Sequence, residues 1–205
     1  MTTIGVLALQ GDFLEHEAVL RYLGVDAVQV RKSETLRDLD GLIVPGGEST
    51  TICRLMEEYQ LYKPLRRVLG SGLPAWGTCS GMIVLAQRVQ GLGYPTLEAL
   101  DIAVERNGYG RQVDSFETDI HVSILGELPF HAIFIRAPVV REVGADVEVL
   151  ARLPAADGGE DGSPVAVRQG NILATTFHPE LTEDSRLHRY FLSIVESAGS
   201  RSNPK

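Results

Sequence analysis

Cys79 stands at the centre of Gly77-Thr78-Cys79-Ser80-Gly81, where an apolar strand-like segment passes into a helical one. Glycines on both sides permit a sharp turn and close packing of strand and helix behind it. This is the pattern of a nucleophile elbow with cysteine in place of serine. The helix expected over Ser80–Arg88 would place Cys79 at its positive end, where the thiolate is favoured. The pattern indicates covalent chemistry, and a buried cysteine in a core turn is the alternative.

His178 stands at the carboxyl end of another apolar strand, Asn171–Phe177, and precedes Pro179. The proline keeps His178 extended and out of a helix. Side chains two apart in an extended segment share a face, so Glu180 is expected to hold one imidazole nitrogen while the other faces the thiol. A nucleophilic cysteine needs such an oriented base. Cys79, His178 and Glu180 are therefore the expected catalytic residues, although His-Pro-Glu alone is more often a capped loop.

A glycine-rich turn, Pro45-Gly46-Gly47-Glu48-Ser49-Thr50, follows the apolar segment Gly41–Val44. Backbone N–H groups in such a turn and after the elbow suit an oxyanion, and the candidates are Gly46, Gly47 and Ser80. Ser49 or Thr50 is expected to cap the helix that follows, because apolar residues then recur at helical spacing. A turn without a catalytic role would explain the same residues.

Strand-like and helical segments alternate along the first half of the chain. Strands are expected at Thr3–Leu9, Val25–Val30, Gly41–Val44 and Leu73–Gly77, and helices at Phe13–Leu23, Ser49–Tyr59, Tyr62–Leu69 and from Ser80. This alternation predicts an α/β fold with a doubly wound, mostly parallel sheet. Short strands at Asp101–Glu105, Glu117–Val122, Ala132–Ile135, Val147–Leu153 and Val165–Gln169 predict a small antiparallel extension. The three motifs all follow strands, so they are expected to meet at the carboxyl edge of the sheet.

The 205 residues and 44% hydrophobic content predict a single domain over residues 1–197, closed by a helix near Asp184–Ser197 and followed by a flexible tail over 198–205. A net charge of −8 without a basic stripe argues against nucleic-acid binding. No apolar run is long enough to span a membrane, and polar residues interrupt the first one, which argues against a signal peptide. The two cysteines, Cys53 and Cys79, indicate no disulfide scaffold, and we expect a cytoplasmic protein.

The five histidines do not show the Cys/His spacing of a zinc site; they are His16, His121, His131, His178 and His188. We therefore expect no metal site and no cofactor. His16 and His188 lie in amphipathic helical segments, where we expect partly exposed structural histidines. The acidic segment Ala155–Ser163 is expected to be a solvated hairpin tip.

Together these motifs resemble the class I, triad-type glutamine amidotransferases, in which a cysteine elbow is paired with a downstream His-x-Glu. Residues 4–12, 45–51, 134–138 and 177–182 resemble more narrowly the glutaminase subunits of two-component pyridoxal 5′-phosphate synthase. The resemblance runs from about residue 3 to residue 195. Ser80, where alanine is common in the family, and the longer acidic segment depart from the family pattern. Neither departure removes a residue of the triad.

The resemblance implies that the chain hydrolyses glutamine to glutamate and ammonia through a thioester on Cys79. Ammonia would pass to a separate synthase subunit, expected to be a ring of TIM barrels. The implied substrate-binding residues are Gly47, Glu48, Ser49, Arg106, Ile135 and Arg136. An arginine fork suits a substrate carboxylate. Arg106 lies in a glycine-containing loop where it could simply be solvated, whereas Arg136 lies between apolar neighbours and its charge needs a partner.

The segment Gln10-Gly11 follows the first strand, near the same edge of the sheet. Because free ammonia is lost to solvent unless it is handed on, we expect a glutaminase that serves a synthase to be poorly active alone and to be switched on by docking. Gln10 and Gly11 are the candidate partner-sensitive loop, because a glycine can flip its peptide at low cost. A rigid turn is an equally good explanation of these residues.

Three alternatives stay open at this stage. The glutaminase subunit of another synthase, such as imidazole glycerol phosphate synthase, would keep the triad and change the acceptor of ammonia. A non-catalytic module of the same fold would use Cys79 for binding or redox sensing, against which His178 and Glu180 argue. A cysteine peptidase or deglycase on a similar sheet would differ in its substrates.

Overall fold

The computed structural model describes residues 2–106, 108, 115–154 and 162–201. The strands are β1 (Thr3–Leu7), β2 (Asp26–Val30), β3 (Gly41–Val44), β4 (Ala75–Thr78), β5 (Ala86–Gln90), β6 (Leu100–Glu105), β7 (Ser115–Ile120), β8 (Phe130–Ile135), β9 (Val139–Val143), β10 (Glu148–Arg152), β11 (Pro164–Gln169) and β12 (Ile172–Thr175). The helices are α1 (Phe13–Tyr22), α2 (Ser49–Glu58), α3 (Tyr62–Gly70), α4 (Ser80–Leu85) and α5 (Arg186–Arg201), with 3₁₀ turns at Ser33–Asp38, Ser123–Leu125 and Pro179–Leu181. None of the helices described has the length and apolar character needed to cross a membrane.

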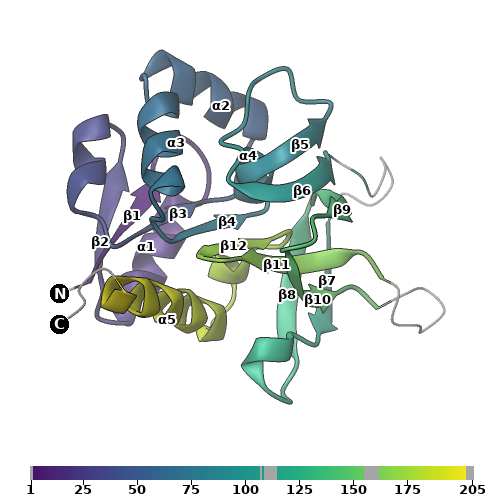
Figure 1. The fold of residues 1–205 in the computed structure, drawn as a ribbon. Coiled ribbons are helices and arrows are strands. Elements are labelled where there is room, and N and C mark those ends of the chain that lie inside the picture. Colours follow the sequence, from purple (N-terminus) through teal and green to yellow (C-terminus); the bar gives the residue numbers. More distant parts are fainter. Residues whose placement is uncertain (1, 107, 109–114, 155–161, 202–205) are drawn as a thin grey trace.

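A seven-stranded sheet in the order β10-β11-β12-β4-β3-β1-β2 forms the centre of the molecule (Figure 1). The five strands from β12 to β2 are parallel, and β11 and β10 extend one edge with antiparallel pairing. Ala75 of β4 pairs with both Leu42 of β3 and Ile172 of β12, so the carboxyl ends of these strands lie side by side. The doubly wound, mostly parallel sheet expected from the sequence is confirmed.

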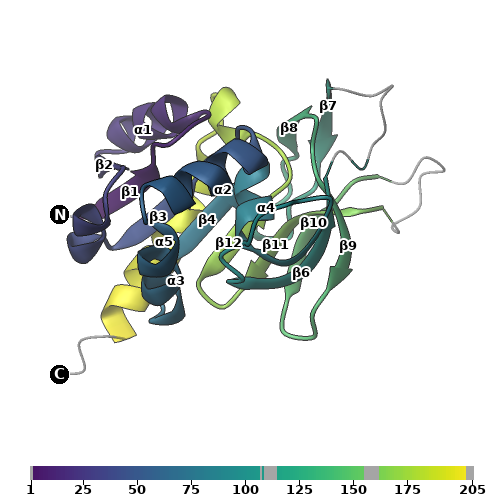
Figure 2. The ribbon, with the colours of Figure 1, turned by 90° about the horizontal axis from the view of Figure 1, so that it is seen from above.

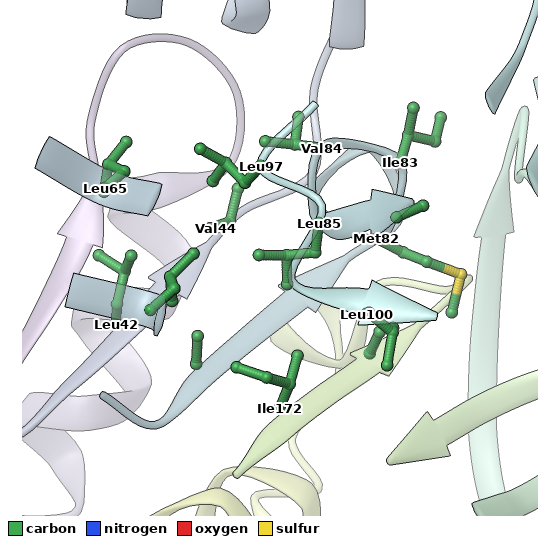
Figure 3. Packing of buried hydrophobic residues seen from close by; sticks show 14 of the residues in the cluster. Leu42, Val44, Leu65, Met82, Ile83, Val84, Leu85, Leu97, Leu100 and Ile172 are labelled. Carbon is green, nitrogen blue, oxygen red and sulfur yellow. The ribbon is translucent and has the colours of Figure 1, made fainter. Parts of the chain in front are cut away.

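Helices cover both faces of this sheet. Helices α2, α3 and α4 lie on one face, and α1 and α5 lie on the other (Figure 2). Alternate residues of one strand therefore enter different cores: Leu42 packs on the first face and Ile43 on the second. Figure 3 shows the first core, where Leu42, Val44 and Ile172 of the sheet meet side chains of α3 and α4. Burial on both faces explains why the central strands are apolar without alternation.

Two smaller sheets, β5-β6-β9 and β7-β8, make up the rest of the extension. The β7-β8 pair is antiparallel, as expected of the extension, and β6 also pairs antiparallel with β9, whereas β5 runs parallel to β6. The helix after the elbow ends at Leu85, not at Arg88, and Ala86–Gln90 form β5. The reason is tertiary: the N–H groups of Leu97 and Ala99 bond the carbonyls of Val84 and Leu85, which a longer helix would use. Strand β9 was not expected at all.

The last helix continues to Arg201, beyond the end expected at Ser197. Residues 198–201 of the expected flexible tail are thus helical, and residues 202–205 lie outside the part of the chain that the structure describes. The acidic hairpin tip expected at Ala155–Ser163 falls largely on residues 155–161, which are also outside the described residues.

The expectation that His16 and His188 are partly exposed is wrong, because both are 0% exposed. His16 of α1 and His188 of α5 meet over the central strand β4, with His16 Nδ1 3.0 Å from His188 Nε2. The Trp76 ring packs edge-on against both imidazoles, at centroid distances of 5.7 and 4.8 Å. The pattern of a single helix cannot reveal this burial, since it arises where two helices cover the same strand.

These two histidines make the stability of the fold depend on pH. Burial lowers the pKa of His188 to about 4, and burial together with the charges of His188 and His178 lowers the pKa of His16 well below its ordinary value. As pH falls from about 6.5 toward 4, the unfolded chain takes up protons that the folded chain excludes, so stability is lost over that range. We expect the His188→Phe variant to escape its part of this loss. Between pH 7 and pH 4, the unfolding free energy of the wild type relative to this variant should fall by about 3 kcal/mol.

Urea unfolding at several pH values measures this difference. A matched control is His121→Gln, because His121 is exposed. The control should follow the wild-type curve throughout. Parallel curves for the wild type and His188→Phe would contradict the account.

Candidate active site

The expected site residues converge on one cavity of about 320 Å³ at the carboxyl edge of the sheet. The cavity lies where β1, β3 and β4 end and where the segment after β12 passes close by. Its lining contains Gln10, Gly11, Asp12, Gly47, Glu48, Ser49, Cys79, Ser80, Ile83, Arg106, Ile135, Arg136 and His178. Gly46 and Glu180 lie directly behind this lining, in contact with His178. The fold therefore brings together segments that are far apart in the sequence.

Cys79 occupies the apex of the turn between β4 and α4. Its backbone has φ 47° and ψ −107°, a left-handed conformation that is uncommon for a residue with a side chain. A hydrogen bond of 2.8 Å from the Cys79 N–H to the Thr175 carbonyl ties the turn to β12. The Sγ atom lies 3.7 Å from the Ile135 carbonyl oxygen, so the thiol faces the cavity. Backbone strain of this kind occurs at nucleophile elbows and other functional sites.

The flanking glycines leave no room for a side chain. A Cβ atom on Gly81 would lie 1.8 Å from the Val44 carbonyl oxygen, and one on Gly77 would lie 2.6 Å from the Gly81 carbonyl. The packing of α4 against β3 and β4 thus requires glycine at both positions.

His178 and Glu180 form a close pair at the end of β12. Nδ1 of His178 lies 2.7 Å from Oε1 of Glu180, and both side chains are almost fully buried. The turn Pro179–Leu181, instead of the expected extended segment, brings the two side chains together. A bond of 2.9 Å from the His178 N–H to the Ile133 carbonyl fixes the backbone. The ring is therefore oriented from two directions.

The charges around His178 favour its protonated form. Burial opposes this charge, but the side chains of Asp12, Cys79 and Glu180 outweigh burial and raise the pKa of His178 well above its ordinary value. Burial raises the pKa of Glu180, while its bond to His178 acts in the opposite direction. An imidazolium held between a thiol and a carboxylate is the arrangement that a cysteine nucleophile requires.

Asp12 is a site residue that the motif analysis missed. Its Oδ2 lies 3.3 Å from Nδ1 of His178, on the same side as Glu180. The signal was present, because Asp12 follows Gln10-Gly11 at the end of the first strand. Asp12, His178 and Glu180 are the one group of potential metal ligands found in the described ranges. The 2.7 Å bond to Glu180 occupies the His178 nitrogen that a metal would need, so we assign the group to proton chemistry.

The backbone N–H groups near Cys79 differ in their availability. The Gly46 N–H donates to Thr78 Oγ1 at 3.0 Å, so it is engaged inside the protein and the oxyanion candidates narrow to Gly47 and Ser80. The Ser80 hydroxyl donates to the Gly47 carbonyl and joins the elbow to the glycine-rich turn. Gln10 Oε1 accepts the Glu48 N–H at 2.6 Å, which fastens this turn to the loop after β1.

Glu48, not Ser49 or Thr50, caps α2. Its carboxylate accepts bonds from the N–H groups of Thr50 and Thr51, at 3.1 and 2.7 Å. Although burial opposes ionisation, the bonds from Thr51 and Thr50 lower the pKa of Glu48 to about 2. Arg106 donates to Glu48 Oε1 at 2.9 Å and to the Gly91 carbonyl, so its guanidinium is held at the cavity instead of being solvated.

Arg136 lines the same cavity with φ 43°, another left-handed backbone. No hydrogen bond or ion pair joins its side chain to the residues described. The partner that its charge requires is therefore not supplied by this part of the chain. An anionic group in the cavity would supply it.

The packing at the elbow leads to a prediction about stability. We expect Gly81→Ala to lower the unfolding free energy by about 3 kcal/mol, because the added methyl group meets the Val44 backbone and must displace α4. Gly70→Ala, at the end of α3 with open space around it, should change stability by less than about 1 kcal/mol. Denaturant unfolding of both variants checks this. Equal stabilities would show that α4 does not need the close approach.

Comparison with known proteins agrees with this geometry. Residues 6–197 match the SNO glutamine amidotransferase family. The chain is 54% identical to the pyridoxal 5′-phosphate synthase subunit PdxT of Pelotomaculum thermopropionicum, over 96% of each chain. It is 56% identical to the subunit of the same name from Thermus thermophilus, over 94% of this chain and 97% of that one.

Solved structures show the same relationship. A crystal structure of a glutamine amidotransferase superposes with a TM-score of 0.86 at 52% identity, covering 94% of this chain and 98% of the other. A chain of the PurLQS structure from Thermotoga maritima, at 17% identity and a TM-score of 0.65 over 94% and 97% of the two chains, shares the fold. With its elbow cysteine and its strand-end histidine at one cavity, the chain belongs to the SNO glutamine amidotransferase family.

Proposed function

We propose that this protein hydrolyses L-glutamine to L-glutamate and ammonia and supplies the ammonia to a separate synthase subunit for pyridoxal 5′-phosphate synthesis. One observation carries the proposal. In the cavity of this chain, Cys79 has a strained backbone and faces the cavity, and His178 beside it is oriented by the buried carboxylate of Glu180. The names of the relatives supply the acceptor, since they are subunits of pyridoxal 5′-phosphate synthase.

In the proposed reaction, the Cys79 thiolate attacks the carboxamide carbon of glutamine. The carbonyl oxygen becomes an oxyanion, for which the N–H groups of Gly47 and Ser80 are the proposed donors. When the C–N bond breaks, His178 gives its proton to the leaving nitrogen and ammonia departs. His178 then takes a proton from water, which attacks the thioester and releases glutamate and the thiolate. Glu180 holds His178 in place through both steps.

The charges at the cavity suit the amino-acid end of glutamine. We assign the guanidinium of Arg136, which has no bond to the described residues, to the substrate α-carboxylate, because a planar fork binds a carboxylate well. Glu48, with its low pKa, suits the α-ammonium group, and Arg106 holds the Glu48 carboxylate in place. Gly47, Ser49 and Ile135 line the remaining wall and are proposed to contact the substrate through backbone and small side-chain groups.

The partner is proposed to be the synthase subunit of the same pathway, with the TIM-barrel ring that the resemblance implies. Gln10 and Gly11 are the proposed partner-sensitive loop. Two contacts support this role: Gln10 holds the Glu48 N–H, and a Cβ on Gly11 would lie 1.7 Å from the Gly46 carbonyl oxygen. A movement of this loop would therefore reach the glycine-rich turn directly.

The two cysteines allow a matched test of the nucleophile. Cys79→Ala should lower the rate of glutamate release by at least about 1,000-fold, because no thioester can form. Cys53→Ala is the control, because Cys53 is buried in α2 and burial raises the pKa of its thiol to about 11. This variant should retain the wild-type rate. Glutamate release from glutamine is measured with the synthase subunit present.

Full activity in Cys79→Ala would favour the non-catalytic alternative and reject the proposal. Activity that is unaffected by the pyridoxal 5′-phosphate synthase subunit would reject the proposed acceptor alone. The glutaminase of another synthase would then account for the site.

Substrate binding is tested at Arg136. We expect Arg136→Gln to raise KM for glutamine by about 10- to 100-fold and to change kcat by less than about threefold, because the lost bond is present in both the bound substrate and the transition state. Arg141→Gln removes a surface arginine that pairs with Glu105, and its kinetics should match the wild type. Steady-state kinetics measure KM and kcat for both variants. An unchanged KM in Arg136→Gln would exclude Arg136 from the carboxylate site.

A further inference from the structure

His16 contacts the catalytic carboxylate from the side opposite His178. Its Nε2 atom lies 3.3 Å from Oε2 of Glu180 and 3.2 Å from Oγ1 of Thr78, and all these side chains are buried. The geometry of the contact with Glu180 is not that of a hydrogen bond, and Oε2 accepts no hydrogen bond from any residue described. Thr78 in turn accepts the N–H of Gly46. Nε2 of His16 thus lies between Glu180 of the triad and Thr78, the residue that accepts a hydrogen bond from the glycine-rich turn.

The surroundings determine which nitrogen of His16 carries the proton. If Nε2 carries it, the N–H donates to Thr78 Oγ1 and its positive end lies beside Oε2 of Glu180, while Nδ1 accepts from Nε2–H of His188. If Nδ1 carries it, a nitrogen lone pair faces the carboxylate oxygen. In that case His188 must also hold a proton on Nδ1, which has no hydrogen-bond partner among the described residues. A buried N–H without an acceptor is unfavourable, so we assign the proton of His16 to Nε2.

Two features keep this donor neutral and fixed. Complete burial and the neighbouring histidines lower the pKa of His16, so the ring carries no charge near pH 7. Trp76 packs edge-on against the rings of His16 and His188 and limits their rotation. A neutral donor steadies a carboxylate without cancelling its negative charge. A cationic donor at the same place would weaken the attraction of Glu180 for the His178 imidazolium.

We propose that His16 is a positioning residue of the glutaminase site, which through its Nε2–H holds Glu180 in the ionised, His178-facing position and is itself oriented by His188. This inference rests on the proposed function for its catalytic consequence. His16 does not touch the substrate cavity, so it acts through Glu180 and His178. The arrangement extends the triad inward, from the cavity to the interface of α1 and α5.

The titratable groups near Glu180 come from three segments, and strand β8, which also packs against this turn, contributes only His131, whose exposed ring pairs with Asp119 and Glu117. His178 lies in its own segment, His16 comes from α1, and Asp12 comes from the loop before α1. His188 of α5 reaches Glu180 only through His16, and Cys79 reaches it only through His178. His178 and Cys79 are present in all the variants below, so the effect of a substitution at His16 can be measured as a change in the reactivity of the Cys79 thiol.

The test is the pH dependence of Cys79 alkylation by iodoacetamide, followed on the Cys79 peptide of the full-length protein. In His16→Leu, Glu180 is held less firmly and stabilises the His178 imidazolium less. The imidazolium in turn stabilises the Cys79 thiolate less. We expect the inflection of the rate curve to move up by about half to one pH unit, and the rate at pH 6.5 to fall about fivefold. His16→Gln should restore the wild-type curve within about twofold, because its side-chain amide can donate from near the Nε2 position.

Leu20→Ala is the matched control, because Leu20 is a buried residue one turn further along α1 without a contact to the triad. It should lower stability and leave the inflection in place. A wild-type curve in His16→Leu would overturn the proposal. So would an equal shift in Leu20→Ala, or a folded His16→Gln protein that does not recover.

A second measurement needs no variant. Nitrogen NMR of the ¹⁵N-histidine-labelled wild type should show a neutral His16 with its proton on Nε2 between pH 6 and 8, and a proton on Nδ1 would overturn the proposal. Alkylation and NMR do not require glutaminase activity, so a wild type that fails to hydrolyse glutamine rejects only the proposed function. If glutamine is turned over, kcat of His16→Leu should fall about tenfold with KM within about twofold, and an unchanged kcat would count against the positioning role.

Discussion

A carboxylate that must stay ionised inside the protein is the constraint on which the site depends. Removing such a group from water costs several kcal/mol unless hydrogen bonds and opposite charge compensate. Glu180 is 6% exposed, and the compensation on Oε1 is the 2.7 Å bond to His178, while the neutral ring of His16 lies 3.3 Å from Oε2 without hydrogen-bond geometry. The same compensation fixes the ring of His178. Stability and the proposed catalysis therefore rest on one set of contacts.

The parallel sheet delivers these groups to one place. Strands β1, β3, β4 and β12 end at the same edge, and each contributes one segment to the cavity. Close approach of backbone then sets the distances. Gly81 lies against Val44, Gly11 against Gly46, and Gly46 against the ring of His178, where a Cβ would lie 2.3 Å from Cε1. The left-handed backbone of Cys79 is held by this packing, because its own preference would relax the turn.

The sequence predicted the sheet and the meeting of its motifs, because strand and helix periodicities are local and parallel strands end at one edge. It was less informative where contacts between distant segments determine the end of a helix, its cap or the burial of a side chain. The helix after Cys79 stops at Leu85 since the segment around Leu97 takes its carbonyls. Glu48 caps α2 in place of Ser49, because its longer carboxylate also reaches Arg106. The burial of His16 and His188 depends on two helices that are distant in the chain.

Neutron diffraction from deuterium-exchanged crystals at neutral pH locates the exchangeable hydrogens around Glu180 and shows whether this carboxylate is ionised. We expect a deuterium atom on Nδ1 of His178, directed at Oε1 of Glu180, and none on either carboxylate oxygen. A deuterium atom on a carboxylate oxygen of Glu180, together with an Nδ1 of His178 that carries none, would contradict this expectation. In that case the carboxyl group would be neutral and could not stabilise the imidazolium that the proposed reaction needs.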